Sequence, residues 1–159
     1  MAVSLIVGGL VILLIERIRP RPRIHDVEGM RVRTALAVGF CQVLAMIPGV
    51  SRAGATIMGA MMLRVDRPAA TEFSFFLAVP TLVAAGLYDL WKNRALLSAA
   101  DVPAFGVGMV VAFISAFVVI RWLIRYVATH DFRPFAWYRI AFGAVVLITA
   151  YFGWIDWTA

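Results

Sequence analysis

Apolar residues in this chain are gathered into long runs that are separated by short, mostly basic segments. Three of the runs contain about 18–20 residues each, a length with which a helix crosses the hydrocarbon core of a bilayer. A fourth run is shorter, and a fifth is longer but is interrupted at its centre by a proline-glycine pair. In chain order, the runs are Ala2–Ile15, Thr34–Leu63, Thr71–Leu90, Pro103–Ile120 and Ala136–Ile155.

Helices are the only membrane element that these runs predict. Open strands leave backbone groups unpaired in lipid, and the alternating segments of about 10 residues that are typical of a membrane barrel are absent. The composition agrees, because 63% of the residues are hydrophobic and only 15% are charged, whereas soluble domains have roughly 45–50% and about 25%. We therefore expect an all-α polytopic membrane protein, in which residues 1–159 form a single membrane domain.

The first run, Ala2–Ile15, is too short to cross a membrane by itself. As a helix it would extend about 21 Å, against a hydrocarbon core of roughly 30 Å. No charged segment precedes it and Glu16-Arg17-Ile18-Arg19 follows it, which is the reverse of the charge order in a signal peptide. We expect the chain to begin inside a helix that is longer in the parent protein. Pro20 and Pro22 then prevent the loop from Arg17 to Arg33 from continuing as helix.

The second run, residues 34–63, is predicted to enter the membrane and return on the same side. As one straight helix it would extend about 45 Å, which is too long for the core. The break at Pro48–Arg52 divides it into Thr34–Ile47 and Ala53–Leu63, and each half is too short to cross. The pattern therefore predicts a re-entrant helical hairpin together with about four membrane-spanning helices.

The distribution of basic residues supports the hairpin over a single crossing. With a hairpin, 12 lysines and arginines share one side and only Lys92 and Arg94 face the other, whereas a single crossing gives 8 against 6. Loop lysines and arginines strongly prefer the cytoplasm, so the basic side is predicted to be cytoplasmic, with Met1 and Ala159 outside. The basic side holds Arg17, Arg19, Arg21, Arg23, Arg31, Arg33, Arg64, Arg67, Arg121, Arg125, Arg133 and Arg139.

The net charge of +6 does not indicate nucleic acid as a partner, because all but one of the lysines and arginines flank apolar runs and act as topology signals. Cys41 is the only cysteine, so an internal disulfide and a multi-cysteine metal site are both excluded.

Arg52 is the one basic residue that does not flank an apolar run, and it lies at the predicted hairpin tip. A charged side chain inside an apolar run is costly and marks a functional site by default. The first N–H groups of the returning helix, from Ala53 onwards, and its positive dipole end meet Arg52 there, which creates a site for an anion. Ser51 and Thr56 supply hydroxyl groups, and Gly54 allows the close approach of a ligand. The simpler alternative is that Ser51 and Arg52 only bond backbone carbonyls at the turn.

General-base and metal-binding groups are missing from the hairpin. His25 and His130 fall in predicted loops, and none of the nine acidic residues lies in the hairpin or forms a paired cluster. Glu72 is the nearest carboxylate, and we interpret it as a partner of a helix N-terminal dipole. No metal ligands are predicted in this chain.

Three segments of this sequence carry a resemblance to a known family. They are Gly39-Phe40-Cys41-Gln42, Pro48-Gly49-Val50-Ser51-Arg52-Ala53-Gly54-Ala55-Thr56 and Glu72-Phe73-Ser74-Phe75-Phe76-Leu77-Ala78-Val79-Pro80-Thr81. Together they closely resemble the undecaprenyl-diphosphate phosphatase family of bacitracin-resistance proteins. The resemblance covers nearly the whole chain. It departs at Ala53, where the signature often has serine. It implies that Ser51, Arg52 and Thr56 are catalytic and that Ser51, Arg52, Ala53 and Gly54 bind the substrate.

The resemblance also implies an inverted-repeat architecture, of which this chain would be the C-terminal half. The implied reaction is hydrolysis of undecaprenyl diphosphate to undecaprenyl phosphate at the bacterial inner membrane, on the periplasmic side, for recycling of the peptidoglycan lipid carrier. A divalent cation, Mg or Ca, would be held by residues outside this chain, and a homodimer is an expected partner arrangement. An anion-binding transporter or channel and a catalytically incomplete fragment remain the alternatives.

Overall fold

The computed structural model describes residues 1–18, 20–94 and 102–152, and these residues form helices and no sheet. This confirms the all-α class. Arg19 and the end of the last predicted span, 153–155, lie outside the described residues. The elements are α1 (Ala2–Ile18), α2 (Val32–Val43), the short 3-10 helix η1 (Leu44–Met46), α3 (Arg52–Met62), α4 (Arg67–Lys92), α5 (Val102–Thr129) and α6 (Arg133–Tyr151).

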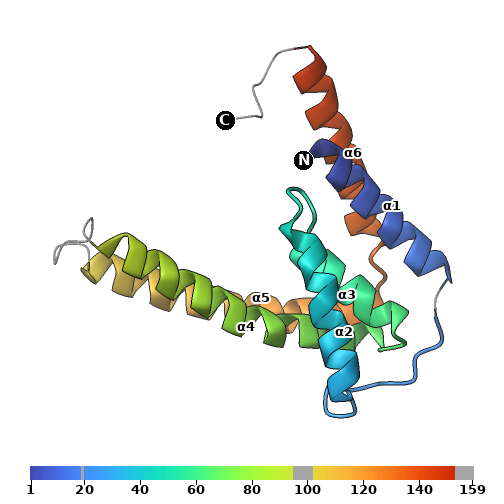
Figure 1. Ribbon diagram of the computed structural model, residues 1–159, viewed down its shortest axis with the longest axis horizontal. Coiled ribbons are helices and arrows are strands. Elements are labelled where there is room, and N and C mark those ends of the chain that lie inside the picture. The colour runs from blue at the N-terminus through green and yellow to red at the C-terminus, as the bar shows by residue number, and fades with distance from the viewer. Residues whose placement is uncertain (19, 95–101, 153–159) are drawn as a thin grey trace.

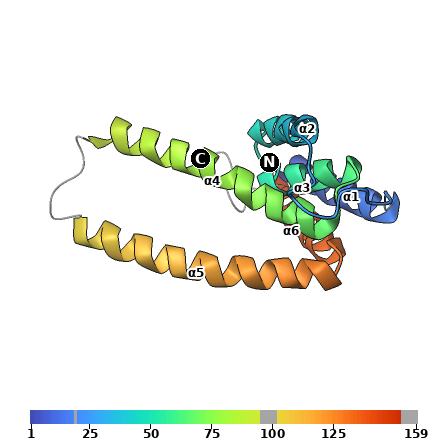
Figure 2. The same cartoon turned by 90° about the horizontal axis from the view of Figure 1, so that it is seen from below.

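The helices are arranged as two arms that meet at a hairpin. Helices α4 and α5 extend away together as one arm, and α1 lies along α6 to form the other (Figures 1 and 2). Helices α2 and α3 stand where the arms meet, and α3 contacts an element of each arm, α4 in one and α1 in the other.

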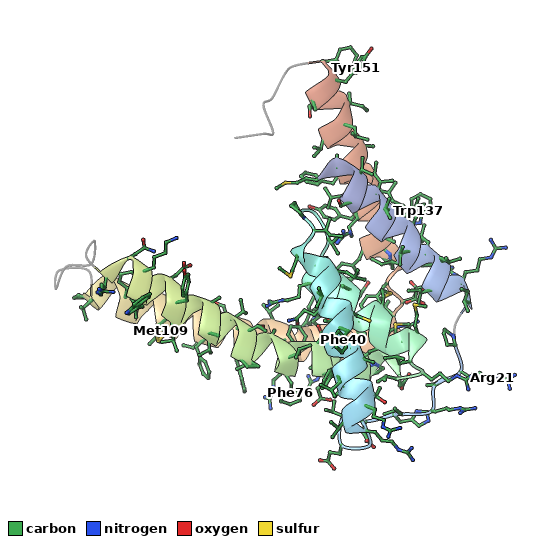
Figure 3. All side chains as sticks on the ribbon, in the orientation of Figure 1. Arg21, Phe40, Phe76, Met109, Trp137 and Tyr151 are labelled. Carbon is green, nitrogen blue, oxygen red and sulfur yellow. The ribbon has the colours of Figure 1, made fainter. Side chains whose placement is uncertain are left out.

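Within the described ranges, three helices, α4, α5 and α6, are long and apolar enough to cross a membrane. The first predicted span is different, because α1 has 17 residues and extends about 26 Å, which is short of a full crossing. Most side chains of the three long helices are exposed, and Phe76, Met109, Trp137 and Tyr151 project outward from their ribbons (Figure 3). Exposed apolar side chains of this density are what a bilayer or a further protein segment covers.

Helix α5 is longer than the sequence pattern predicted. The apolar run ends at Ile120, whereas the helix continues to Thr129. Arg121 and Arg125 end an apolar window without ending a helix, since arginine is a good helix former and its charged end can extend to water.

Glycines allow α1 and α6 to approach closely. A β-carbon placed on Gly9 would lie 2.6 Å from Cγ1 of Ile140, and one placed on Gly143 would lie 2.7 Å from Cγ1 of Ile6. Each helix therefore receives an isoleucine of the other at a position without a side chain, the kind of small-residue contact that packs helices in membranes.

A buried carboxylate joins three segments at the other end of α1. Glu16 is 0% exposed; it accepts a hydrogen bond from Nη2 of Arg67 at 2.7 Å and another from the backbone N–H of Phe132 at 3.0 Å. Arg67 begins α4 and Phe132 precedes α6. The carboxylate therefore fixes α1 against the starts of two other helices, one through an ion pair and one through a backbone hydrogen bond.

The start of α4 also corrects the interpretation of Glu72. Asp66 is the N-cap of this helix and accepts a hydrogen bond from the backbone N–H of Arg67. Glu72 lies beyond the first turn and is exposed, so Asp66 and not Glu72 is the acidic group at the positive end of the dipole.

Candidate anion-binding site

The hairpin turns at Gly49, whose φ angle is +89°. Few residues with a side chain adopt such a φ. A β-carbon there would also lie 2.6 Å from the carbonyl oxygen of Met1 and 3.1 Å from Cβ of Ser4. Two independent constraints therefore require glycine at position 49: the positive φ of the turn and the close contact with the start of α1.

Ser51 caps the returning helix. Its Oγ accepts a hydrogen bond from the backbone N–H of Gly54 at 3.1 Å, and its carbonyl accepts from the N–H of Ala55 at 2.9 Å. The N–H groups of Arg52 and Ala53 have no acceptor within the described part of the chain. These two N–H groups, at the positive end of the α3 dipole, are donors for an anion.

Arg52 begins α3 and reaches sideways to α4. Its Nη1 donates to Oγ1 of Thr81 at 3.2 Å. The other N–H groups of the guanidinium have no acceptor in the ranges that the structure describes and are available for phosphate oxygens.

A second arginine, Arg139 of α6, lies at the same tip. Its Nη2 donates to the carbonyl oxygen of Gly49 at 3.0 Å, and its Nε is buried without a hydrogen-bond partner among the described residues. The side chain crosses α1 at Gly8, where a β-carbon would lie only 2.7 Å from Nη2. Arg139 also lies beside Gly54, where a β-carbon would be 4.0 Å from Nη1.

The sequence interpretation of Arg139 was wrong, because it was counted among the charges of the cytoplasmic side. The signal was present: Arg139 lies inside the predicted span Ala136–Ile155, and an arginine within an apolar run is a candidate site residue just as Arg52 is. Its proximity to the helix start, at Arg133, made it resemble a flanking charge.

Thr56 lies deeper in the hairpin than the other predicted site residues. It is 1% exposed, and its Oγ1 is 2.7 Å from Oγ of Ser74 in α4 and 3.0 Å from the carbonyl oxygen of Arg52, to which it can donate. Ser51, Arg52, Ala53 and Gly54 therefore gather at the tip, whereas Thr56 lies one turn further along α3 at the contact with α4. A catalytic role for Thr56 stays a prediction.

The histidines lie away from the tip. Residue Ile24, next to His25, forms an isolated bridge with Val65, beyond the end of α3, and the carbonyl of His130 accepts from Arg67 at the start of α4. The 11 residues of α3, about 16 Å of helix, separate both positions from the tip.

The residues at the tip do not fit a metal ion. Among the residues that the structure describes, no three His, Cys, Asp or Glu side chains are grouped to hold one. The tip instead offers two guanidinium groups, helix-end N–H groups and a hydroxyl, all of which suit an anion.

The fold and the residues at the tip together define the class: a polytopic helical membrane protein that places two guanidinium groups at the tip of a short helical hairpin. The chain belongs to the family of bacitracin resistance protein BacA, which matches residues 1–145. It is 58% identical to the undecaprenyl-diphosphatase of Polaromonas sp. (strain JS666 / ATCC BAA-500) over 161 residues, which cover 99% of this chain and 58% of that protein.

Two further relatives give the same result. The undecaprenyl-diphosphatase of Polaromonas naphthalenivorans (strain CJ2) is 59% identical, over 98% of this chain and 58% of that protein. That of Acidovorax ebreus (strain TPSY) is 58% identical, over 98% of this chain and 57% of that protein. The chain thus spans less than three-fifths of the length of these curated relatives.

Proposed function

We propose that this chain supplies the phosphate-binding part of an undecaprenyl-diphosphate phosphatase. The observation that carries the proposal is that two arginines from different helices, Arg52 and Arg139, meet at one hairpin tip in a chain of the BacA family. Relatives with the name undecaprenyl-diphosphatase are similar to it over nearly its whole length.

In this proposal the diphosphate headgroup lies at the tip while the polyprenyl tail stays in lipid. The guanidinium of Arg52 and the N–H groups of Arg52 and Ala53 donate to oxygens of the terminal phosphoryl group, and Arg139 adds a second positive charge. These groups oppose the negative charge of the substrate and stabilise the phosphoryl group during transfer. The glycine at position 54 leaves space beside Arg139 for the headgroup.

The reaction is the hydrolysis of a phosphoanhydride. A water oxygen forms a bond to the terminal phosphorus, and the bond from that phosphorus to the bridging oxygen breaks. The products are undecaprenyl phosphate and inorganic phosphate. The proton acceptor for the water and the ligands of a divalent cation would come from residues outside this chain, since the described residues at the tip offer guanidinium, N–H and hydroxyl groups and no group of metal-ligating side chains.

Ser51 is assigned the role of a hydrogen-bond donor. One lone pair of its Oγ already accepts the N–H of Gly54, which leaves its proton free for a phosphate oxygen. An attack by Oγ on phosphorus would require that cap to be given up and a base to be nearby. Thr56 is proposed to act on the substrate only through Arg52, whose carbonyl it contacts.

We further infer an inner-membrane location with the site open to the periplasm, on the basis of the loop charges. The membrane-embedded nature of the chain itself follows from its three long apolar helices and its family. The C-terminal position of the chain within a longer enzyme and a homodimer both stay predictions.

A phosphate-release assay tests the proposal. The protein to assay is a chimera in which this chain replaces the matching 58% of the Polaromonas sp. relative, with the chain alone in parallel. We expect the chimera to release phosphate from undecaprenyl diphosphate, and Arg52→Ala to abolish the release. Anion flux across vesicles without hydrolysis would contradict the phosphatase in favour of a transporter, and activity confined to the chimera would identify the chain alone as catalytically incomplete.

A further inference from the structure

Helix α4 presents two hydroxyl groups to the hairpin, at Ser74 and Thr81. These positions are seven residues apart and therefore lie on one face of the helix. Ser74 meets Thr56, with 2.7 Å between the two hydroxyl oxygens, and Thr81 meets Arg52. Arg52 and Thr56 are in turn four residues apart on one face of α3. The two helices thus share a polar contact that ends at the arginine of the proposed site.

The hydroxyl of Thr81 has a defined orientation. Its proton points back to its own helix, where the carbonyl oxygens of Leu77 and Ala78 lie 3.0 Å and 2.9 Å from Oγ1. Because this bond uses the only proton of the hydroxyl, Oγ1 can act towards other groups only as an acceptor, and it accepts from Nη1 of Arg52. The backbone of α4 therefore determines where the acceptor for the arginine is placed.

The same helix also supports the other end of Arg52. Thr56 can donate to the carbonyl oxygen of Arg52, at 3.0 Å, and Ser74 then donates to Oγ1 of Thr56. The guanidinium of Arg52 therefore meets α4 directly through Thr81, and its carbonyl meets α4 indirectly, through Thr56 and Ser74.

The guanidinium groups of Arg52 and Arg67 differ in the chemical nature of their hydrogen-bond acceptors. The guanidinium of Arg67 meets the buried carboxylate of Glu16 at 2.7 Å, so its positive charge is compensated within the protein. Arg52 and Arg139 instead donate to neutral oxygens, those of Thr81 and Gly49. A neutral acceptor orients a guanidinium and leaves its full charge for an incoming anion, whereas a carboxylate would cancel it.

We propose that Thr81 is a positioning residue for Arg52: it holds the guanidinium at the hairpin tip, with no carboxylate paired to it among the described residues, in the orientation in which it binds the diphosphate. The inference deepens the proposed function and rests on it for the identity of the substrate. The alternative is that the hydrogen bond merely satisfies a partly buried polar group, in which case its loss affects folding and leaves anion binding unchanged.

The experiment compares Thr81→Val, which removes the hydroxyl at nearly constant shape, with Thr81→Ser, which keeps it. Thr71→Val is the control, because Thr71 is another threonine of α4, more deeply buried than Thr81, and its hydroxyl donates to the carbonyl of Arg67 in its own helix. All variants are made in the chimera, and kcat and KM for undecaprenyl diphosphate are measured with the melting temperature.

We expect Thr81→Val to lower kcat/KM by about 10- to 100-fold, the range that misplacement of a substrate-binding group produces. Thr81→Ser and Thr71→Val should remain within about threefold of the parent, since both leave the contact with Arg52 in place. In an Arg52→Lys background, Thr81→Val should cause little further loss, because the group that it positions has already been changed. An equal loss in both backgrounds, or a loss that follows the melting temperature, would overturn the inference.

Binding of inorganic pyrophosphate, measured by its effect on the melting temperature, gives a readout that does not depend on hydrolysis. The parent and Thr71→Val should be stabilised at about tenfold lower pyrophosphate concentration than Thr81→Val. If the parent binds pyrophosphate in this Thr81-dependent way but releases no phosphate, the proposed function fails and the positioning role stands. If hydrolysis is present and Thr81→Val matches the parent in both measurements, the positioning role fails and the function stands. Absence of both binding and hydrolysis in the parent contradicts both.

Discussion

Arg139 in α6 donates from Nη2 to the carbonyl oxygen of Gly49 across 3.0 Å, although the two residues are 90 positions apart in the chain. The bond connects the last described helix to the turn of the hairpin. It brings a second guanidinium to the tip at which Arg52 begins α3. The proposed site therefore depends on both arms of the fold.

The first prediction concerns Arg139 itself. Arg139→Ala should lower kcat/KM for phosphate release by about 100-fold, because it removes a charge that stabilises the transferred phosphoryl group. Arg139→Lys should retain part of the activity, since it keeps the charge but loses the planar donor group. Arg125→Ala is the control, because Arg125 is exposed on α5. Equal activity of Arg139→Ala and Arg125→Ala would contradict the assignment.

The second prediction concerns the passage of Arg139 across α1. A β-carbon on Gly8 would lie 2.7 Å from Nη2 of Arg139, whereas one on Gly39 would meet nothing within 4 Å. Gly8→Ala should therefore displace the guanidinium and reduce kcat/KM by about tenfold, while the melting temperature changes little because a side-chain end can move. Gly39→Ala in α2 should leave activity unchanged. Steady-state kinetics and thermal unfolding give kcat/KM and the melting temperature of the Gly8→Ala and Gly39→Ala variants, and these values test the prediction.

The third prediction concerns the turn. Gly49→Ala requires a side chain at φ +89° and within 2.6 Å of the carbonyl oxygen of Met1, so it should destabilise the protein by about 1–3 kcal/mol. Gly86→Ala, at a helical position with nothing within 4 Å, should be neutral or slightly stabilising. The measurement is thermal unfolding in detergent. A Gly49→Ala variant as stable as Gly86→Ala would show that the turn tolerates a side chain.

The fourth prediction concerns the buried ion pair. Glu16→Leu leaves Arg67 without its carboxylate and should reduce the free energy of unfolding by about 3 kcal/mol. Glu16→Gln should cost less, because its amide oxygen can still accept the N–H of Phe132. The double variant Glu16→Leu with Arg67→Met should recover part of the loss, since no uncompensated charge then remains. A double variant less stable than Glu16→Leu would contradict this account.

The fifth prediction concerns topology. In a Cys41→Ser background, Glu28→Cys and Asn93→Cys should react with an impermeant maleimide from opposite sides of the membrane, because the loop charges place them so. In spheroplasts, Asn93→Cys should react at once and Glu28→Cys only after lysis. Labelling in the opposite order would reverse the proposed orientation.

Much of the fold could be predicted from the spacing of apolar residues, since length alone decides whether a helix can cross a bilayer. The hairpin followed from Pro48-Gly49 in the middle of one apolar run, and the structure confirms two short helices on either side of that turn. The end of α5 could not be predicted in this way, because hydropathy detects the edge of an apolar window and Thr129 lies beyond that edge.

The candidate site was predicted in part. Ser51 and Arg52 were found because a breaker, a capping residue and a charge are adjacent in the sequence. Thr81 was not singled out, since a hydroxyl in an apolar helix usually bonds its own backbone and carries no signal of a distant partner. Long-range pairs such as Arg139 with Gly49 depend on how α6 packs against α1, which apolar spacing does not determine.

The carboxylate of Glu16 also has a consequence for the order in which the protein is assembled. Arg67 follows Glu16 by 51 residues and Phe132 follows it by 116 residues, so at a translation rate of roughly 5–20 residues per second the later of these two partners emerges about 6–23 s after the carboxylate. During that interval the charge has to remain hydrated at the membrane surface, because burial without its partners is costly. Helix α1 therefore reaches its final place only when the start of α6 has been synthesised, although α1 precedes every other described helix in the sequence.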